Sequence, residues 1–101
     1  MNITITARKF KARETLKDYI RDEVKSLLKF NDSIISANVI LSYQNSQDSV
    51  KKAEISLTIP KQVLVATEES DDFTKSINAA IQKLLRQLKT LKSKRKTRVR
   101  W

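Results

Sequence analysis

Residues 53–67, AEISLTIPKQVLVAT, contain the pattern of two strands joined by a tight turn. Apolar and polar side chains alternate from Ala53 to Ile59, which is the two-residue period of a strand with one buried face. Pro60 ends that strand because it has no N–H to donate to a neighbouring strand. It also presets the backbone angle of a tight turn, in a chain that contains no glycine. Residues 62–67 then resume as a strand, so the whole stretch predicts a β-hairpin.

Alternation on the N-terminal side of the hairpin predicts two more strands, over residues 2–7 and 36–43. Between them, apolar residues recur at three- and four-residue spacing, which predicts a helix of about four turns beginning near Glu14. The Asn-Asp-Ser sequence at residues 31–33 breaks that helix, and residues 44–50 form a polar loop before the hairpin.

The last element is the longest, and one apolar stripe defines it. The stripe consists of Phe73, Ile77, Ala80, Ile81, Leu84, Leu88 and Leu91. At 100° per residue, these positions fall within roughly a third of a helix circumference. Ser70 or Asp71 is the expected N-terminal cap. Since the pattern stops beyond Lys92, we expect residues 93–101 to form a basic, flexible C-terminal tail.

The predicted element order is β-α-β-β-β-α, an α+β fold in which two helices pack on one face of a four-stranded sheet. This plan is similar to that of double-stranded RNA-binding domains, an analogy of fold that carries little weight for function. The 101 residues suffice for a single domain, which we place at residues 1–92, ahead of the tail at 93–101.

Histidine, cysteine and glycine are all absent. Without cysteine there is no disulfide, thiolate nucleophile or zinc cage, and without histidine the usual general base is missing. Without glycine no phosphate-cradling loop motif can be written. No apolar run approaches the ~18 residues of a membrane helix, and the first ten residues lack a signal peptide's hydrophobic stretch. We therefore expect a soluble, intracellular binding protein that is not an enzyme and uses neither cofactor nor metal.

The net charge of +10 is unevenly placed along the chain. Residues 1–82 hold 12 basic and 11 acidic side chains, a net of +1, whereas residues 83–101 hold nine basic side chains and no acid. Such segregated charge indicates a polyanionic partner, and it favours nucleic acid over a membrane surface. A solubilising tail is the alternative, but such a tail has no reason to continue an amphipathic helix.

Basic residues in three segments are the candidates for phosphate contacts. The last helix and the tail contribute Lys83, Arg86, Lys89, Lys92, Lys94, Arg95 and Lys96, without an acid in the run or an i, i+4 partner. The first helix contributes Lys17, Arg21 and Lys25, and acids three residues before Arg21 and Lys25 partly neutralise this stripe. The connection before the first helix contributes Arg8 and Lys9, beside Lys11 and Arg13.

Acidic and aromatic residues have simpler interpretations. The acids Glu68, Glu69, Asp71 and Asp72 resemble a magnesium site, but acids near a helix start also oppose the macrodipole, and we favour that structural role. The aromatic residues Tyr19, Phe30, Tyr43 and Phe73 lie on apolar stripes, so we expect them in the core rather than as base-stacking platforms. Trp101 is either a base-stacking group among arginines or simply a chain end.

Several stretches, in order, resemble one bacterial family. Residues 2–8, NITITAR, followed by Phe10, are similar to the start of the short ribosome hibernation-promoting and ribosome-associated inhibitor proteins, also labelled sigma-54 modulation proteins. The segments LKDYI at 16–20, DSII at 32–35, VIL at 39–41, AEI at 53–55, LTIP at 57–60 and LVA at 64–66 resemble later parts of the family pattern. The most specific matches are DDF at 71–73, Ile77 and KLLRQL at 83–88, and the resemblance covers about residues 1–95.

The resemblance implies a non-catalytic protein that binds the small ribosomal subunit where mRNA and tRNAs sit, and that inactivates ribosomes in stationary phase or stress. It implies rRNA contacts from Lys83, Arg86, Lys92 and Lys94, and from Lys17 on the first helix. The expected protein is a cytoplasmic monomer without a small-molecule substrate. Since the chain stops before the C-terminal dimerisation domain of longer members, we do not expect it to dimerise ribosomes by that route.

The sequence departs from the family pattern at several positions. Arg13 stands where the family commonly has a capping Ser or Thr, and Lys61 stands near positions that are glycine in the family.

Two other functions also stay open. One is a general structured-RNA-binding module with a non-ribosomal target, which the charge distribution supports equally well. The other is a nuclease, which would use Mg²⁺ at Asp71 and Asp72.

Overall fold

The structure, a computed structural model, describes residues 1–44 and 50–99, and the side chains of these ranges as far as Leu91. Its elements in chain order are β1 (Asn2–Ala7), α1 (Glu14–Ser26), the short 3-10 helix η1 (Leu27–Lys29), β2 (Ser36–Tyr43), β3 (Lys51–Ile59), β4 (Gln62–Ser70) and α2 (Phe73–Val99). The order confirms the predicted β-α-β-β-β-α fold. No helix within the described ranges is long and apolar enough to cross a membrane.

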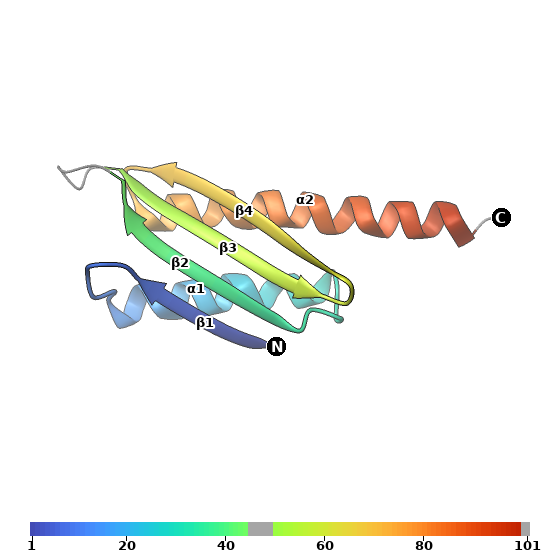
Figure 1. Cartoon of the computed structure of the whole chain (residues 1–101), viewed down its shortest axis with the longest axis horizontal. Coiled ribbons are helices and arrows are strands. Elements are labelled where there is room, and N and C mark those ends of the chain that lie inside the picture. The colour runs from blue at the N-terminus through green and yellow to red at the C-terminus, as the bar shows by residue number, and fades with distance from the viewer. Residues whose placement is uncertain (45–49, 100–101) are drawn as a thin grey trace.

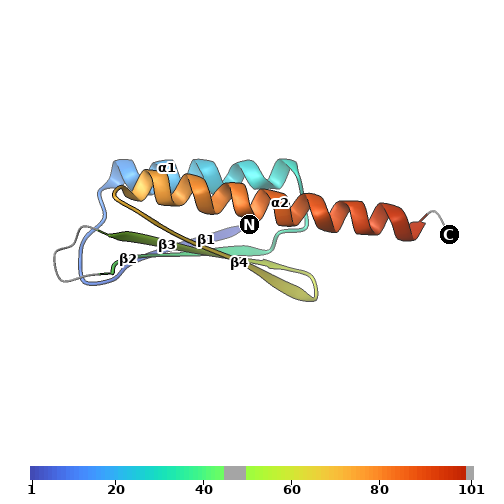
Figure 2. The same ribbon diagram turned by 90° about the horizontal axis from the view of Figure 1, so that it is seen from above.

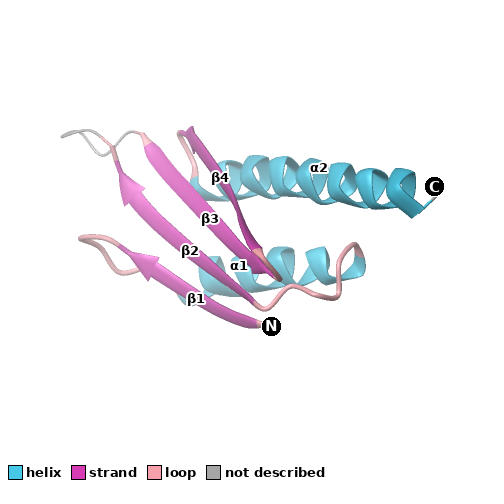
Figure 3. Ribbon diagram, turned by 45° about the vertical axis from the view of Figure 1, so that its right-hand side comes forward, coloured by secondary structure: helices cyan, strands magenta, loops and turns pink. Residues whose placement is uncertain are grey.

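The four strands form one sheet in the order β1-β2-β3-β4 (Figure 1). β1 and β2 are parallel, with Asn2 opposite Ser36 and Ala7 opposite Leu41, because α1 forms the crossover between them. The pairs β2–β3 and β3–β4 are antiparallel. Both helices cover the same face of the sheet (Figure 2), and Figure 3 shows its other face without a helix.

The core lies between the sheet and the two helices. Its fully buried members include Ile20 and Val24 of α1, Val39 and Ile55 of the sheet, and Leu84 of α2. Burying a side chain of this size stabilises the fold by about 1.5–3 kcal/mol. The predicted α2 stripe is confirmed, because all its members down to Leu88 are buried and Leu91 packs against the core at its margin.

The β3–β4 turn contains only Pro60 and Lys61, since Ile59 pairs with Gln62. Lys61 has a φ of 72°, in the left-handed region that glycine or asparagine usually occupies. Proline followed by a residue with positive φ is the pattern of a type II turn. Pro60 therefore acts as predicted, and Lys61 takes the strained position of the turn.

The predicted cap of α2 is wrong by one or two residues, because the cap is Asp72. Its Oδ1 atom accepts hydrogen bonds from the Thr74 N–H at 2.9 Å and the Thr74 hydroxyl at 2.8 Å. Ser70 instead stabilises the turn between β4 and α2, since its hydroxyl donates to the Asp72 carbonyl at 2.6 Å. The hydrogen bonds from Thr74 hold the pKa of the Asp72 carboxyl below its ordinary value.

Several predicted boundaries also shift. β4 extends to Ser70 rather than ending at Thr67, because it pairs with β3 as far as Lys51. Residues 93–99 continue the helical backbone of α2 to Val99, while the domain boundary at residue 92 and a flexible tail at 93–101 stay predictions. Of the predicted loop at residues 44–50, positions 45–49 lie outside the described residues.

Candidate nucleic-acid interface

The loop between β1 and α1 presents four exposed cations, Arg8, Lys9, Lys11 and Arg13, which we call the loop cluster. Phe10 anchors the loop, because its ring stacks on the Phe73 ring with centroids 5.2 Å apart and meets Tyr43 edge-on at 5.0 Å. The ion pairs found among the described residues include no member of the loop cluster. Four cations are therefore held on an anchored backbone at the end where both helices begin (Figure 1).

The basic stripe of α1 is partly neutralised. Arg21 donates from Nη1 to Asp18 Oδ1 at 3.2 Å, as the sequence predicts. Lys17 also has a partner, because its Nζ lies 3.7 Å from Glu14 Oε1. The predicted neutralisation of Lys25 by Asp22 is not seen, because Lys25 is exposed and no ion pair described for residues 1–44 and 50–91 involves it. Of the three predicted contacts on α1, Lys25 is the one that keeps its charge uncompensated.

Lys83 on α2 has an acidic partner that the helical pattern does not reveal. Its Nζ lies 3.0 Å from Glu68 Oε1 on β4 and 3.5 Å from the Thr67 carbonyl oxygen. Gln87, one helical turn further, donates to the Val65 carbonyl at 3.2 Å. Lys83 and Gln87 thus face the outer edge of β4, and the charge of Lys83 is compensated there.

Arg86 and Lys89, which we call the α2 cluster, point away from the sheet on the exposed side of α2. Neither takes part in an ion pair within the described part of the chain. The Lys89 Nζ lies 5.7 Å from the centroid of the Phe30 ring. The side chains of Lys92, Lys94, Arg95 and Lys96 lie outside the described residues, although the backbone at these positions is helical.

The two clusters are well separated, because the loop cluster lies between β1 and α1 and the α2 cluster lies further along α2. Phe10 in the loop touches Phe73, the first residue of α2, whereas Arg86 follows Phe73 by 13 residues. At 1.5 Å of rise per residue, Arg86 lies about 20 Å along the helix axis from Phe73. α1 and α2 run side by side in the same direction (Figure 1). The structure therefore offers two basic surfaces rather than one patch.

Three of the four acids before α2 make structural contacts. Glu68 pairs with Lys83, Asp71 Oδ1 lies 3.2 Å from Lys75 Nζ, and Asp72 caps the helix. Within the described ranges, no group of three or more acidic, cysteine or histidine side chains is placed to hold a metal ion. These contacts support the structural interpretation of the acidic run over the magnesium site.

The prediction that all four aromatic residues lie in the core is wrong for Phe30. Phe73 is buried, and Tyr19 and Tyr43 pack at the margin of the core. Burial, with the carboxylates of Glu23 and Asp72 nearby, raises the pKa of the Tyr19 phenol. Phe30 is 45% exposed, because it follows η1 at the point where the chain leaves the helical layer.

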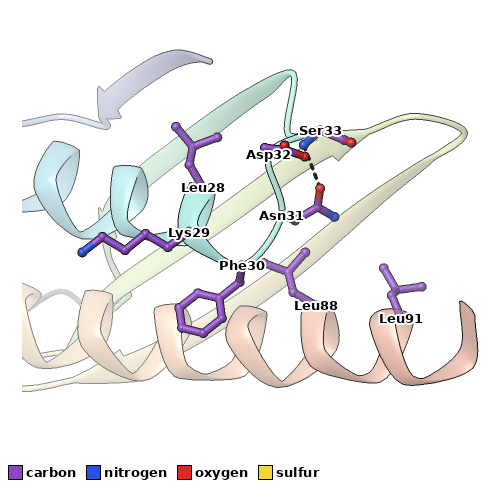
Figure 4. A pocket seen from close by; sticks show the side chains of 8 residues that line it. All are labelled: Leu28, Lys29, Phe30, Asn31, Asp32, Ser33, Leu88 and Leu91. Atoms are coloured by element: carbon purple, nitrogen blue, oxygen red, sulfur yellow. Dashed lines mark hydrogen bonds between the residues drawn. The ribbon is translucent and has the colours of Figure 1, made fainter. Parts of the chain in front are cut away.

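Phe30 lines a pocket of about 350 Å³ between the η1–β2 loop and α2 (Figure 4). The lining residues are Leu28, Lys29, Phe30, Asn31, Asp32, Ser33, Leu88 and Leu91. Sequence reasoning missed this site. The available signal was an aromatic residue directly before the Asn-Asp-Ser break, where a helical stripe no longer guarantees burial.

One family model matches most of the chain, and several curated proteins are similar to it. Residues 3–96 match the model of the sigma 54 modulation protein / S30EA ribosomal protein family. A ribosome hibernation promoting factor of Pseudomonas putida is 30% identical over 97 residues, which cover 96% of this chain and 92% of that protein. The ribosome-associated factor Y of Haemophilus influenzae is 30% identical over 98 residues, 97% of this chain and 89% of that protein.

Solved structures agree with the fold. A ribosomal subunit interface protein from Coxiella burnetii superposes with a TM-score of 0.83 at 22% identity, over 92% of this chain and 99% of that one. The N-terminal domain of Protein Y from Thermus thermophilus gives a TM-score of 0.79 at 26% identity, over 90% of this chain and 99% of that one.

Proposed function

This chain belongs to the sigma 54 modulation protein / S30EA ribosomal protein family, and from that membership we propose that it is a ribosome hibernation factor. It binds the small ribosomal subunit, occupies the channel of mRNA and tRNA, and inactivates ribosomes in stationary phase or stress. It acts in the cytoplasm as a monomer, by occupancy rather than by catalysis, and needs no cofactor.

The observation that carries this proposal is the α2 cluster. Arg86 and Lys89 are exposed cations without ion-pair partners in the described part of the chain, on a helix whose opposite face is buried in the core. A cation held on such a scaffold neutralises a phosphate and releases condensed counterions, which gives tight, salt-sensitive binding. Phosphate contacts position a protein on RNA without reading sequence. We therefore assign selectivity for the subunit to the shape of its channel.

The remaining predicted contacts extend this surface. Lys92, Lys94, Arg95 and Lys96 follow the α2 cluster along the same helical backbone, and we propose them as further phosphate contacts. The loop cluster supplies a second surface, and Lys25, 11 residues after the start of α1 and so about 16 Å along its axis, is a separate exposed cation. The paired Lys17, Arg21 and Lys83 contribute less. The names of the relatives favour the ribosome over a different structured RNA as the partner.

Co-sedimentation with purified small subunits across 50–200 mM salt tests the proposal. If six to ten phosphates are contacted, the affinity should fall by about 10³–10⁵ over this range. The double variant Arg86→Gln, Lys89→Gln should flatten the slope of log K against log salt by about 1.4–1.8. The matched control is Lys75→Gln, on the same helix but paired with Asp71, which should leave the slope unchanged.

Three outcomes would contradict the proposal. If the wild-type protein fails to bind small subunits in 50 mM salt, or if translation continues unhindered at saturating protein, the hibernation function is wrong. If free duplex RNA competes as well as subunits do, the protein is a general RNA-binding module. Circular dichroism of each variant checks that the fold is intact.

A further inference from the structure

Phe30 is an aromatic side chain that the core does not require. Leu27 before it and Ile34 after it are 1% and 4% exposed and close the core at this end of α1, while Phe30 is 45% exposed. Aromatic rings usually contribute to folding by being buried. The half-exposed ring of Phe30 therefore leaves an aromatic face on the wall of a pocket.

The loop that carries Phe30 is held in place by its own hydrogen bonds. The N–H groups of Phe30 and Asn31 donate to the Leu27 carbonyl at 3.0 and 3.1 Å. The Asn31 Oδ1 accepts the Ser33 N–H at 2.8 Å, the dashed contact in Figure 4. A ligand that enters this pocket therefore meets a formed wall and has little loop entropy to overcome.

The chemistry of the pocket matches that of a nucleotide. Leu88 and Leu91 of α2 line it on the side opposite the loop with apolar surface, and Phe30 adds an aromatic face. The Lys89 ammonium, 5.7 Å from the ring centroid, places a positive charge at the edge of the pocket. Asn31 and Ser33 add hydrogen-bonding groups, the Asp32 carboxylate adds an acceptor for the amino group of a base, and Lys29 adds a cation that offsets its charge. Its volume of about 350 Å³ lies within the usual range of small-molecule pockets.

We propose that this pocket holds one unstacked base of single-stranded RNA, with Phe30 as the stacking platform and Lys89 on the adjacent phosphate. The inference rests on the proposed function, which supplies the RNA, and it adds a base contact to binding that is otherwise carried by phosphates. Aromatic platforms of this kind accept any base, because every base has a π-face.

The test compares Phe30 variants in binding to purified small subunits. Phe30→Ala should weaken binding by about 5- to 150-fold, the fold-change that corresponds to loss of one base stack. The loss should be the same at every salt concentration, because the ring carries no charge. Phe30→Tyr should retain the affinity, and Phe30→Leu should not restore it. The control is Ile35→Ala, which truncates an apolar side chain that is 54% exposed and does not line the pocket.

A second readout observes the stack directly. Phe30→Trp combined with Trp101→Phe leaves a single tryptophan in the pocket wall. Stacking on a base should quench its fluorescence when small subunits are added, and Lys89→Gln in that background should reduce the affinity and the salt slope but not the final quenching.

The outcomes separate the pocket from the proposed function. If wild type binds subunits and Phe30→Ala binds equally well, the base pocket is wrong and the hibernation function stands. If Phe30→Leu binds as tightly as wild type, the contact is apolar rather than stacked, which also overturns the inference. If wild type does not bind subunits at low salt, the proposed function fails and the pocket inference fails with it.

Discussion

At the scale of single residues, identical charges have different roles because their neighbours differ. Lys83 and Arg86 are three residues apart on α2 and both are exposed. Lys83 is compensated by the Glu68 carboxylate at 3.0 Å, whereas no acid pairs with Arg86 in the described ranges. A cation that is already paired gains less from a phosphate, because the existing contact must be broken first.

We expect Lys83→Gln to reduce the salt slope of subunit binding by less than Arg86→Gln does. Arg86→Gln should lower it by about 0.7–0.9, the value for one phosphate contact, since Arg86 needs no rearrangement to bind. Titrations at four or more salt concentrations measure both slopes. Glu68→Gln is the matched control, and it should raise the affinity by freeing Lys83. Equal slope losses for Lys83→Gln and Arg86→Gln would show that the ion pair has no influence.

At the scale of elements, α2 carries opposite charges at its two ends. Asp72 caps its start, while the basic residues are concentrated in its second half. This arrangement complements the helix macrodipole, whose N-terminal end is positive and whose C-terminal end is negative. The buried stripe between the ends holds the helix on the sheet, so the basic half is positioned by the core rather than by its own charges.

The Asp72 cap predicts a pH dependence of stability. Because the folded-state pKa lies below the ordinary value of 3.8, the carboxylate contributes stability that is fully present above that value. The contribution is lost as pH falls through the lower folded-state pKa. Asp72→Asn retains a capping oxygen but does not titrate. We therefore expect wild type to be more stable than Asp72→Asn at pH 7, with the difference closing in acid.

Urea unfolding at pH 7 and at several values below 4 measures this difference. Thr74→Val is the companion variant, because it removes the hydroxyl that donates to Asp72 at 2.8 Å. In that variant the contribution of Asp72 should disappear at a higher pH than in wild type. A difference between wild type and Asp72→Asn that stays constant down to pH 2 would contradict the role assigned to the charge.

At the scale of the whole molecule, the fold separates two basic surfaces. The loop cluster is anchored at the start of α2 by the Phe10–Phe73 stack, and the α2 cluster follows about 20 Å along the helix axis. The molecule is elongated, with principal extents of 54 × 22 × 19 Å. The loop that carries the loop cluster connects the sheet to the helical layer at the end where both helices begin, whereas the α2 cluster lies on the helical layer itself (Figure 2). A shape of this kind suits a long groove lined by RNA.

Sites this far apart should contribute independently to binding. We expect the free-energy losses of a loop-cluster variant, with Arg8, Lys9, Lys11 and Arg13 changed to Gln, and of Arg86→Gln, Lys89→Gln to add within about 0.5 kcal/mol in the combined variant. Each set alone should reduce the salt slope. Binding of the three variants to small subunits at one salt concentration tests this. A variant set that by itself leaves both the affinity and the salt slope unchanged would show that its surface does not contact RNA.

Local patterns in the chain were sufficient for the elements and their order. Alternation predicted β1 and β2 to the residue, and the apolar stripe of α2 predicted its buried face from Phe73 to Leu88. Periodicity predicts these elements well because each element buries one face. One-sided burial requires apolar residues at a regular spacing among residues that are close in sequence. The patterns predicted the ends of elements less accurately. The cap of α2 is Asp72 rather than Ser70 or Asp71, because a cap depends on individual hydrogen bonds.

Composition and local patterns establish the α+β plan, the family resemblance and the concentration of positive charge after residue 82. The folded arrangement is needed to show that Lys83 is paired with Glu68, and that Phe30, unlike Tyr19, Tyr43 and Phe73, is exposed. Lys83 meets Glu68 across 15 residues of sequence, and Lys89 meets Phe30 across 59. Electrostatic compensation and burial depend on distances in space, and the packing of α2 against β4 and α1 sets those distances.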